Sequence, residues 1–245
     1  MQFLRVLAKL LHLLQHIAVG WWTIRRHFPS MDEATREQRI QTWSLQVLQV
    51  FGITLRVYGT PPTQGPLLLV ANHISWLDIA VIHAAGYCRF VSKSDVKHWP
   101  IVGTLATGSG TLYIERESRR DAMRVVHHMA ERLRAGDVLA VFPEGTTGDG
   151  RSMLPFHANL LQAAISADAP VLPMALRYVD AHTGALHFAP SFVGDETLVR
   201  SLWRTLGAYT LAAEVRFGAP QRAEGRDRRT WAQDLQQTVE QLQKR

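Results

Sequence analysis

The sequence predicts an α/β fold in which a mixed, largely parallel sheet is wrapped by helices. Short, continuously apolar runs such as residues 67–71 are typical of strands that are covered on both faces. These runs alternate along the chain with longer helical patterns, which is the order expected of β-α-β units. The chain has 245 residues, of which 47% are hydrophobic and 20% charged, so wholesale disorder and the fibrous and coiled-coil classes are excluded.

The first expected helix covers residues 3–24 and is unusually apolar. Most residues in and beside this segment that are not strongly apolar fall within one arc of roughly 80° on a helical wheel. They are Gln2, Arg5, Lys9, His12, His16, Gly20, Thr23 and His27. No uninterrupted apolar stretch reaches ~20 residues and no small-residue cleavage site follows, which disfavours a spanning helix and a signal peptide. Such a helix requires a protein core or a lipid interface. Because Trp21 and Trp22 precede Arg25 and Arg26, we expect monotopic membrane attachment, with a buried core helix as the alternative.

The remaining elements follow in order. Ser30 and Glu33 have the spacing of a capping box, which predicts a second helix over residues 32–50. Residues 1–51 are therefore interpreted as membrane-associated helices and residues 52–245 as the α/β domain. Strands are expected at residues 53–58, 67–71, 89–92, 111–115, 138–142, 171–179 and 213–217, with a turn at 182–184 leading into 186–192. Helices are expected at residues 76–85, 118–135, 159–167 and 228–243.

The charge and cysteine content narrow the class of partner. Lysine and arginine number 27 against 21 aspartate and glutamate, which gives a formal net charge of +6 and a pI near 9.9. Such a surface favours nucleic acid or anionic lipid. No RNA-recognition, zinc-finger or helix-turn-helix signature is present, so we expect an anionic membrane surface and no nucleic acid. The single cysteine, Cys88, lies in an apolar run and is expected to be a buried thiol in a reducing compartment.

Reactive residue types follow three of the predicted strands, where parallel sheets gather their chemistry. In the loop from Asn72 to Asp78, the carboxylate can orient the imidazole of His73 while the other ring nitrogen removes a proton from a hydroxyl. The alternative is structural, with His73 closing the strand and Asp78 capping a helix. The sequence has no His-Glu-x-x-His helix and no cysteine-histidine cluster, so no metal is expected.

The other two loops carry groups that suit an anionic or polyol ligand. Glu144, Gly145 and Thr146 follow the strand at 138–142, and glycine there permits close backbone approach. Glu144 could equally be an exposed loop carboxylate. Arg116 follows the strand at 111–115, where it could bind a phosphate in a forked geometry or pair with a neighbouring glutamate.

Taken together, these loops carry an ordered set of motifs. They read His73-x4-Asp78, Gly110-x-x-Tyr113-x-x-Arg116, Phe142-Pro143-Glu144-Gly145-Thr146 and Ala169-Pro170-Val171-Leu172-Pro173, with Lys93 and Pro100-Ile101-Val102-Gly103 between the first two. Their order and separations resemble the glycerolipid acyltransferase family, which includes the 1-acylglycerol-3-phosphate acyltransferases. The resemblance covers residues 67–173.

The resemblance implies a role for each matching residue. His73 is expected to be the general base and Asp78 its orienting carboxylate. The expected substrate-binding residues are Arg116, Glu144, Gly145 and Thr146 at the acceptor's polar head, Lys93, and Pro173 on the acyl-donor side. The implied donor is a thioester, either acyl-CoA or acyl-carrier protein, and no cofactor is implied beyond this co-substrate. A thioester is already activated, which suits a base without a nucleophilic serine.

Two departures bear on the acceptor. Thr147 stands where many family members have arginine, and Phe156-His157-Ala158-Asn159 stands in place of a lysine-rich stretch, although Arg151 could compensate. The expected acceptor is 1-acylglycerol 3-phosphate, which would give phosphatidic acid, and a lyso-ornithine lipid is the alternative. A membrane-binding protein without turnover is a third possibility. The expected location is the cytoplasmic face of the inner membrane, with monotopic or peripheral attachment.

Overall fold

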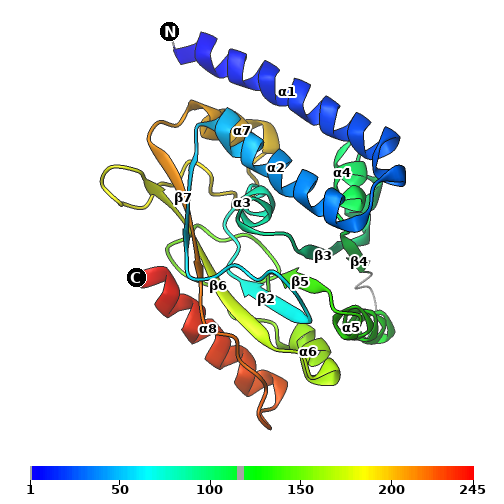
Figure 1. Cartoon of the computed structure of the whole chain (residues 1–245). Coiled ribbons are helices and arrows are strands. Elements are labelled where there is room, and N and C mark those ends of the chain that lie inside the picture. The colour runs from blue at the N-terminus through cyan, green and yellow to red at the C-terminus, as the bar shows by residue number, and fades with distance from the viewer. Residues whose placement is uncertain (1, 115–118) are drawn as a thin grey trace.

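A seven-stranded sheet organises the chain, whose computed structural model describes residues 2–114 and 119–245 (Figure 1). The strand order is β1-β7-β6-β2-β5-β3-β4, and among the described strands only the β6–β7 pair is antiparallel. The strands are β1 (Thr54–Tyr58), β2 (Leu67–Ala71), β3 (Arg89–Lys93), β4 (Leu112–Ile114), β5 (Val138–Val141), β6 (Val171–Asp180) and β7 (Leu211–Phe217). The mixed, largely parallel sheet predicted from the apolar runs is confirmed.

Helices cover both faces of this sheet. They are α1 (Gln2–Arg26), α2 (Glu33–Phe51), α3 (Asp78–Ala85), α4 (Val102–Gly108), α5 (Arg119–Arg134), α6 (Leu161–Ala167), α7 (Leu198–Gly207) and α8 (Arg228–Lys244). Alternate residues of β2 enter opposite cores, since Leu69 packs with α1, α2, α3 and α7 while Leu68 packs with α5, α6 and α8. This two-sided burial explains why β2 is apolar at every position.

The start of α2 differs from the capping box predicted at Ser30. The N-cap is Asp32, whose carboxylate accepts hydrogen bonds from the amide (2.8 Å) and hydroxyl (2.9 Å) of Thr35. Ser30 instead donates its hydroxyl to the carbonyl of His27 in a short 3-10 turn. The prediction was wrong because an aspartate two residues later offers a stronger acceptor at the positive end of the helix.

Two short helices were not predicted from the sequence. α4 lies between the strands expected at residues 89–92 and 111–115, where no helix was predicted, and its N-cap residue makes no side-chain capping bond. α7 begins after Thr197, whose hydroxyl accepts a hydrogen bond from the Arg200 amide. Residues 186–192 form one isolated bridge, Val179 to Leu186, and no further strand. The buried state of Cys88 is confirmed, and burial raises the pKa of its thiol.

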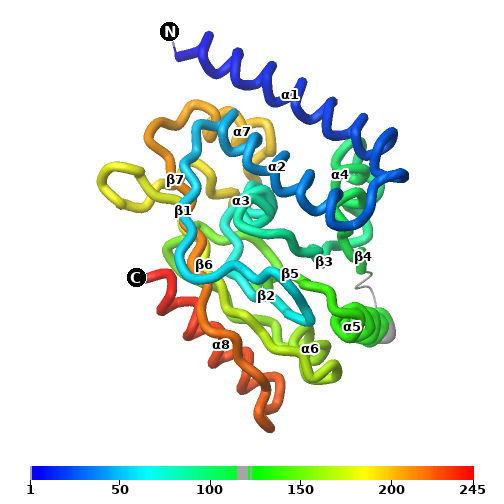
Figure 2. The backbone as a smooth tube through the Cα atoms, viewed as in Figure 1, coloured from blue at the N-terminus to red at the C-terminus, as the bar shows by residue number. Residues whose placement is uncertain are grey.

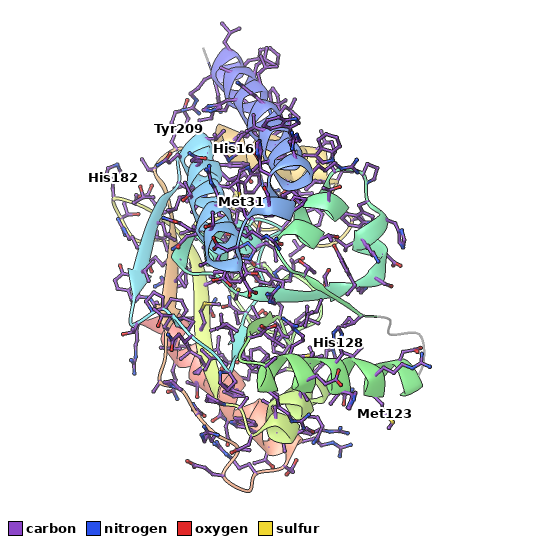
Figure 3. The ribbon with its side chains drawn as sticks, turned by 45° about the vertical axis from the view of Figure 1, so that its right-hand side comes forward. His16, Met31, Met123, His128, His182 and Tyr209 are labelled. Carbon is purple, nitrogen blue, oxygen red and sulfur yellow. The ribbon has the colours of Figure 1, made fainter. Side chains whose placement is uncertain are left out.

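α1 lies against the body with its polar arc turned inward. Arg5 donates to the carbonyl of Gly207 (3.0 Å) and Lys9 to that of Phe51 (2.6 Å). The ring of His16 stacks on Trp43 between α1 and α2, with Nε2 at 3.1 Å from the Trp43 carbonyl (Figure 3). The side chains exposed on the outward face are mostly apolar and include Phe3, Leu4, Leu7, Leu11, Leu14, Val19 and Trp22. α1 is thus an amphipathic helix whose apolar side faces away from the protein.

Candidate active site

The loop between β2 and α3 brings an imidazole and a carboxylate into direct contact. Nδ1 of His73 lies 2.8 Å from Oδ2 of Asp78, which also accepts the amides of Ile74 (2.7 Å) and Ser75 (2.9 Å). Asp78 is the first residue of α3, and the loop that precedes it follows β2 directly (Figure 2). The carboxylate of Asp78 therefore orders the loop backbone and holds the imidazole, and it does not cap α3, whose N-cap is Leu77 without a side-chain capping bond. Its catalytic role remains a prediction.

The second oxygen of Asp78 has a partner that sequence reasoning missed. Oδ1 accepts a hydrogen bond from the hydroxyl of Tyr178 on β6 at 2.7 Å, and both side chains are buried. Burial and the neighbouring Asp78 charge raise the pKa of Tyr178 well above its usual value, so the phenol keeps its proton and donates it. A tyrosine inside an apolar strand requires a partner for its hydroxyl, and that signal was present in the sequence.

The imidazole of His73 stacks on an aromatic ring but remains partly exposed to solvent. It stacks on the ring of Phe142, with centroids 3.9 Å apart and planes inclined by 8°. The side chain is 20% exposed, and Nε2 has no hydrogen-bond partner among the described residues. With Nδ1 committed to Asp78, Nε2 is the nitrogen free to take a proton from a ligand hydroxyl.

Residues of the loop after β5 form hydrogen bonds with both the amide and the carbonyl of His73. Oε1 of Glu144 accepts the His73 amide at 2.7 Å, and Oε2 accepts the Leu154 amide at 2.8 Å. The carbonyl of His73 accepts the Gly148 amide at 2.7 Å. Burial raises the pKa of Glu144, against the two amide bonds and the nearby His73, which lower it. The alternative of an exposed loop carboxylate is wrong, since Glu144 is buried.

Comparison with known proteins assigns the chain to a family. A family model described as Acyltransferase matches residues 53–177. The lyso-ornithine lipid O-acyltransferase of Pseudomonas aeruginosa is 35% identical over 96% of this chain and 92% of that protein. The 1-acyl-sn-glycerol-3-phosphate acyltransferase of Neisseria meningitidis serogroup B is 37% identical over 79% of this chain and 76% of that protein. The chain belongs to the acyltransferase family.

The fold of this acyltransferase also matches a solved structure. The 1-acyl-sn-glycerophosphate (LPA) acyltransferase PlsC of Thermotoga maritima aligns with a TM-score of 0.72, covering 100% of this chain and 99% of that one. At 20% sequence identity, this likeness establishes the shared architecture. The family model and the two relatives confirm the predicted family and enzyme class: the protein is an acyltransferase.

The structure distributes the other predicted site residues unevenly. Gly145 and Thr146 are exposed on the loop that grips His73, and Gly145 has the positive φ of 74° that its turn requires. Lys93 is exposed at the end of β3, and β5 lies between β3 and β2. Arg116 falls within residues 115–118, outside the described residues. The substrate-binding roles of all four remain predictions.

Pro173 lies in β6, and its side chain is on the face of the sheet opposite to Tyr178, which hydrogen-bonds to Asp78. It pairs with Val70, and its ring lies against Gly218 beside α8. Tyr178 is five positions along the strand, so its side chain points to the opposite face. The structure therefore does not bring Pro173 to the His73–Asp78 pair, and its role on the donor side remains a prediction.

Proposed function

We propose that this acyltransferase moves a fatty acyl group from a thioester, acyl-CoA or acyl-carrier protein, to the free hydroxyl of a membrane lyso-lipid. The observation that carries the proposal is the free Nε2 of His73 at the carboxyl edge of the sheet, with Nδ1 held by the buried Asp78. Nε2 takes the hydroxyl proton while the oxygen attacks the thioester carbonyl carbon. The carbon–sulfur bond then breaks, and the imidazolium returns its proton to the thiolate.

For the acceptor we propose 1-acylglycerol 3-phosphate, with phosphatidic acid as the product. Gly150 packs beside Ile74, next to His73, and the following residue, Arg151, is exposed. Its guanidinium lies 4.4 Å from the centroid of the Phe188 ring and has no carboxylate partner among the described residues. An exposed, unpaired guanidinium beside the His73 loop suits a phosphate.

A lyso-ornithine lipid is the second candidate acceptor. The Pseudomonas aeruginosa relative named for that activity aligns with nearly the whole chain. Thr147, at the position where a cation was expected for phosphate-binding members, donates its hydroxyl to the carbonyl of Phe192. A neutral loop at this point favours an acceptor that carries no phosphomonoester.

A side-by-side assay with both lyso-lipids and both thioester donors tests the proposal through release of free thiol. We expect the highest kcat/KM with 1-acylglycerol 3-phosphate, and a several-fold loss in Arg151→Ala on that acceptor with a smaller loss on the lyso-ornithine lipid. A preference for lyso-ornithine lipid would overturn the acceptor. Because the steps above use no metal, turnover should survive EDTA; loss restored by a divalent ion would overturn the metal-free mechanism.

We further propose that the outward face of α1 attaches the enzyme to the cytoplasmic leaflet of the inner membrane. α1 is long and apolar enough to cross a membrane. Both of its ends pack on the body, however, with Phe3 near Trp203 of α7 and Ile24 against Gly108 of α4. A helix bound along its length to the protein supports monotopic attachment in the plane of the interface.

A further inference from the structure

Two elements besides α1 expose large apolar side chains. On α7, Val199 is 76% exposed and Trp203 is 38% exposed. In the turn that precedes α4, Trp99 is 54% exposed and Ile101 is 50% exposed. Clustered side chains of this kind on a soluble surface mark a contact with a partner or a membrane.

α7 presents opposite faces to the protein and to the outside. On the inner face, the hydroxyl of buried Ser201 accepts a hydrogen bond from Nε1 of Trp76 at 3.1 Å. Trp76 belongs to the loop between His73 and Asp78, so α7 is directly bonded to the catalytic loop. Val199 and Trp203 are four residues apart and share the outer face.

The turn before α4 holds its apolar side chains outward at a conformational cost. Ile101 has φ of 64°, in the left-handed region that a β-branched residue rarely adopts. Burial cannot account for this conformation because the side chain is half exposed. Strained residues of this kind concentrate at functional sites.

α1 contacts α7 at one of its ends and α4, the helix that follows the turn, at the other. At one end of α1, the rings of Phe3 and Trp203 lie 5.5 Å apart, and at the other Ile24 packs on Gly108 of α4. Figure 1 shows α1 running along the same side of the molecule above α7 and α4. We call this surface the lipid face; it comprises the exposed apolar side chains of α1 together with Trp99, Ile101, Val102, Leu198, Val199 and Trp203.

The charges bordering the lipid face favour an anionic bilayer as its occupant. Lys97 and His98 are exposed immediately before Trp99. Arg200 is exposed beside Val199 on α7, and Arg25 and Arg26 are exposed at the end of α1. Cations flanking exposed tryptophans match a negatively charged headgroup layer above an apolar interior.

We infer that α7 and the turn at residues 99–102 are lipid-contact elements in their own right, which act with α1 to seat the catalytic loop on an anionic bilayer. The inference rests on the proposed membrane attachment and extends it to the helix that is bonded to Trp76. An acceptor embedded in the bilayer would then reach His73 from beside α7 without leaving the lipid.

Vesicle sedimentation of the full chain tests this inference. We expect Trp99→Asp/Val199→Asp to bind phosphatidylcholine–phosphatidylglycerol vesicles at least tenfold more weakly than the wild type, with little binding of either protein to phosphatidylcholine alone. The matched control is Met123→Asp, because Met123 is 74% exposed on α5, well away from α1 (Figure 3). This control should bind as the wild type does.

A second readout separates this inference from the proposed function. With a short-chain, water-soluble lyso-lipid, the double variant should turn over at the wild-type rate, because neither side chain belongs to the site. Unchanged vesicle binding would overturn the inference and leave catalysis standing, whereas absent turnover in the wild type would overturn the proposed function alone. A dimeric wild type that becomes monomeric in the double variant would assign the face to a second copy. If the double variant fails to fold, Val199→Ser supplies the same test.

Discussion

The loop that carries His73 and Asp78 and the helix α1 differ in how far the protein itself covers and hydrogen-bonds their side chains. Asp78 accepts four hydrogen bonds from within the chain, and both oxygens of Glu144 accept backbone amides. α1 also satisfies its inward polar groups, yet leaves a row of leucines uncovered. At the other terminus, α8 buries Trp231, Leu235 and Val239, as an ordinary surface helix does. The polar groups of the loop are therefore satisfied within the protein, whereas α1 leaves an apolar face exposed, which is the face proposed to contact lipid.

The largest expected effect comes from removing the proposed base, His73, while leaving membrane attachment unchanged. We expect His73→Ala to lower kcat by ~10²–10⁴, the range for loss of a positioned base, with vesicle binding unchanged. Steady-state kinetics and sedimentation on the same preparation measure both. His182→Ala, in an exposed turn, is the control and should be silent. Wild-type turnover in His73→Ala would refute the mechanism.

The reverse change removes attachment and leaves the chemistry. In Leu4→Glu/Leu11→Glu, both substitutions lie on the exposed face of α1, so folding should be preserved. Each methylene withdrawn from lipid forfeits about 0.8 kcal/mol, so we expect vesicle partition to fall more than tenfold. Turnover of a water-soluble lyso-lipid should stay at the wild-type rate. Full vesicle binding by a folded double variant would contradict the assignment of this face to lipid.

A finer test concerns the hydroxyl behind the pair. Tyr178→Phe removes one donor to Asp78, which concentrates the carboxylate charge on the imidazole and favours imidazolium. We expect kcat to fall severalfold and the acid limb of the kcat/KM profile to move to higher pH. Tyr87→Phe, which loses a bond to the Ser109 carbonyl, is the matched control. If the acid limb of the kcat/KM profile does not move, Tyr178 has only a packing role.

The smallest expected effect concerns His83, a histidine sealed inside the fold. Burial lowers the pKa of His83 to about 4 from 6.5, and Nε2 lies 3.0 Å from the carbonyl of Cys88. Between these values the unfolded chain binds a proton that the folded chain does not, so stability falls as pH drops from 6.5 towards 4. Urea unfolding should show this slope, and His83→Gln should lessen it by up to ~1.4 kcal/mol per pH unit. An equal slope in both proteins would contradict the assignment.

The parts that could be predicted are those in which one local rule acts alone. β2 is apolar at every position, and the helix expected to end at residue 135 ends at Arg134, followed by Gly136 with a positive φ of 93°. The pairing of His73 with Asp78 followed from a spacing of five residues across a strand end. The clamp by Glu144 could not be predicted, because its partners are backbone amides of distant segments.

Tertiary contacts decided the remaining differences. The N-cap of α2 moved to Asp32 because two candidate caps lay within reach of one helix start. Tyr178 joined the site through the neighbouring position of β6 in the sheet. The wheel of α1 gave the narrow polar arc, but the direction that the arc faces depends on tertiary contacts, such as those with the C-terminal carbonyls of α2 and α7.

The hydrogen bonds from α1 to those carbonyls matter for preparing this enzyme without detergent. Lys9 and Arg5 donate hydrogen bonds to the last carbonyls of two other helices, Lys9 at Phe51 and Arg5 at Gly207. Deleting α1 would remove these hydrogen bonds and expose part of the core that α1 shares with α2 and α7, which includes Leu48 and Leu206, so a shortened chain should aggregate. A water-soluble enzyme is better sought by replacing the outward leucines with polar residues while every inward contact of the first helix is kept.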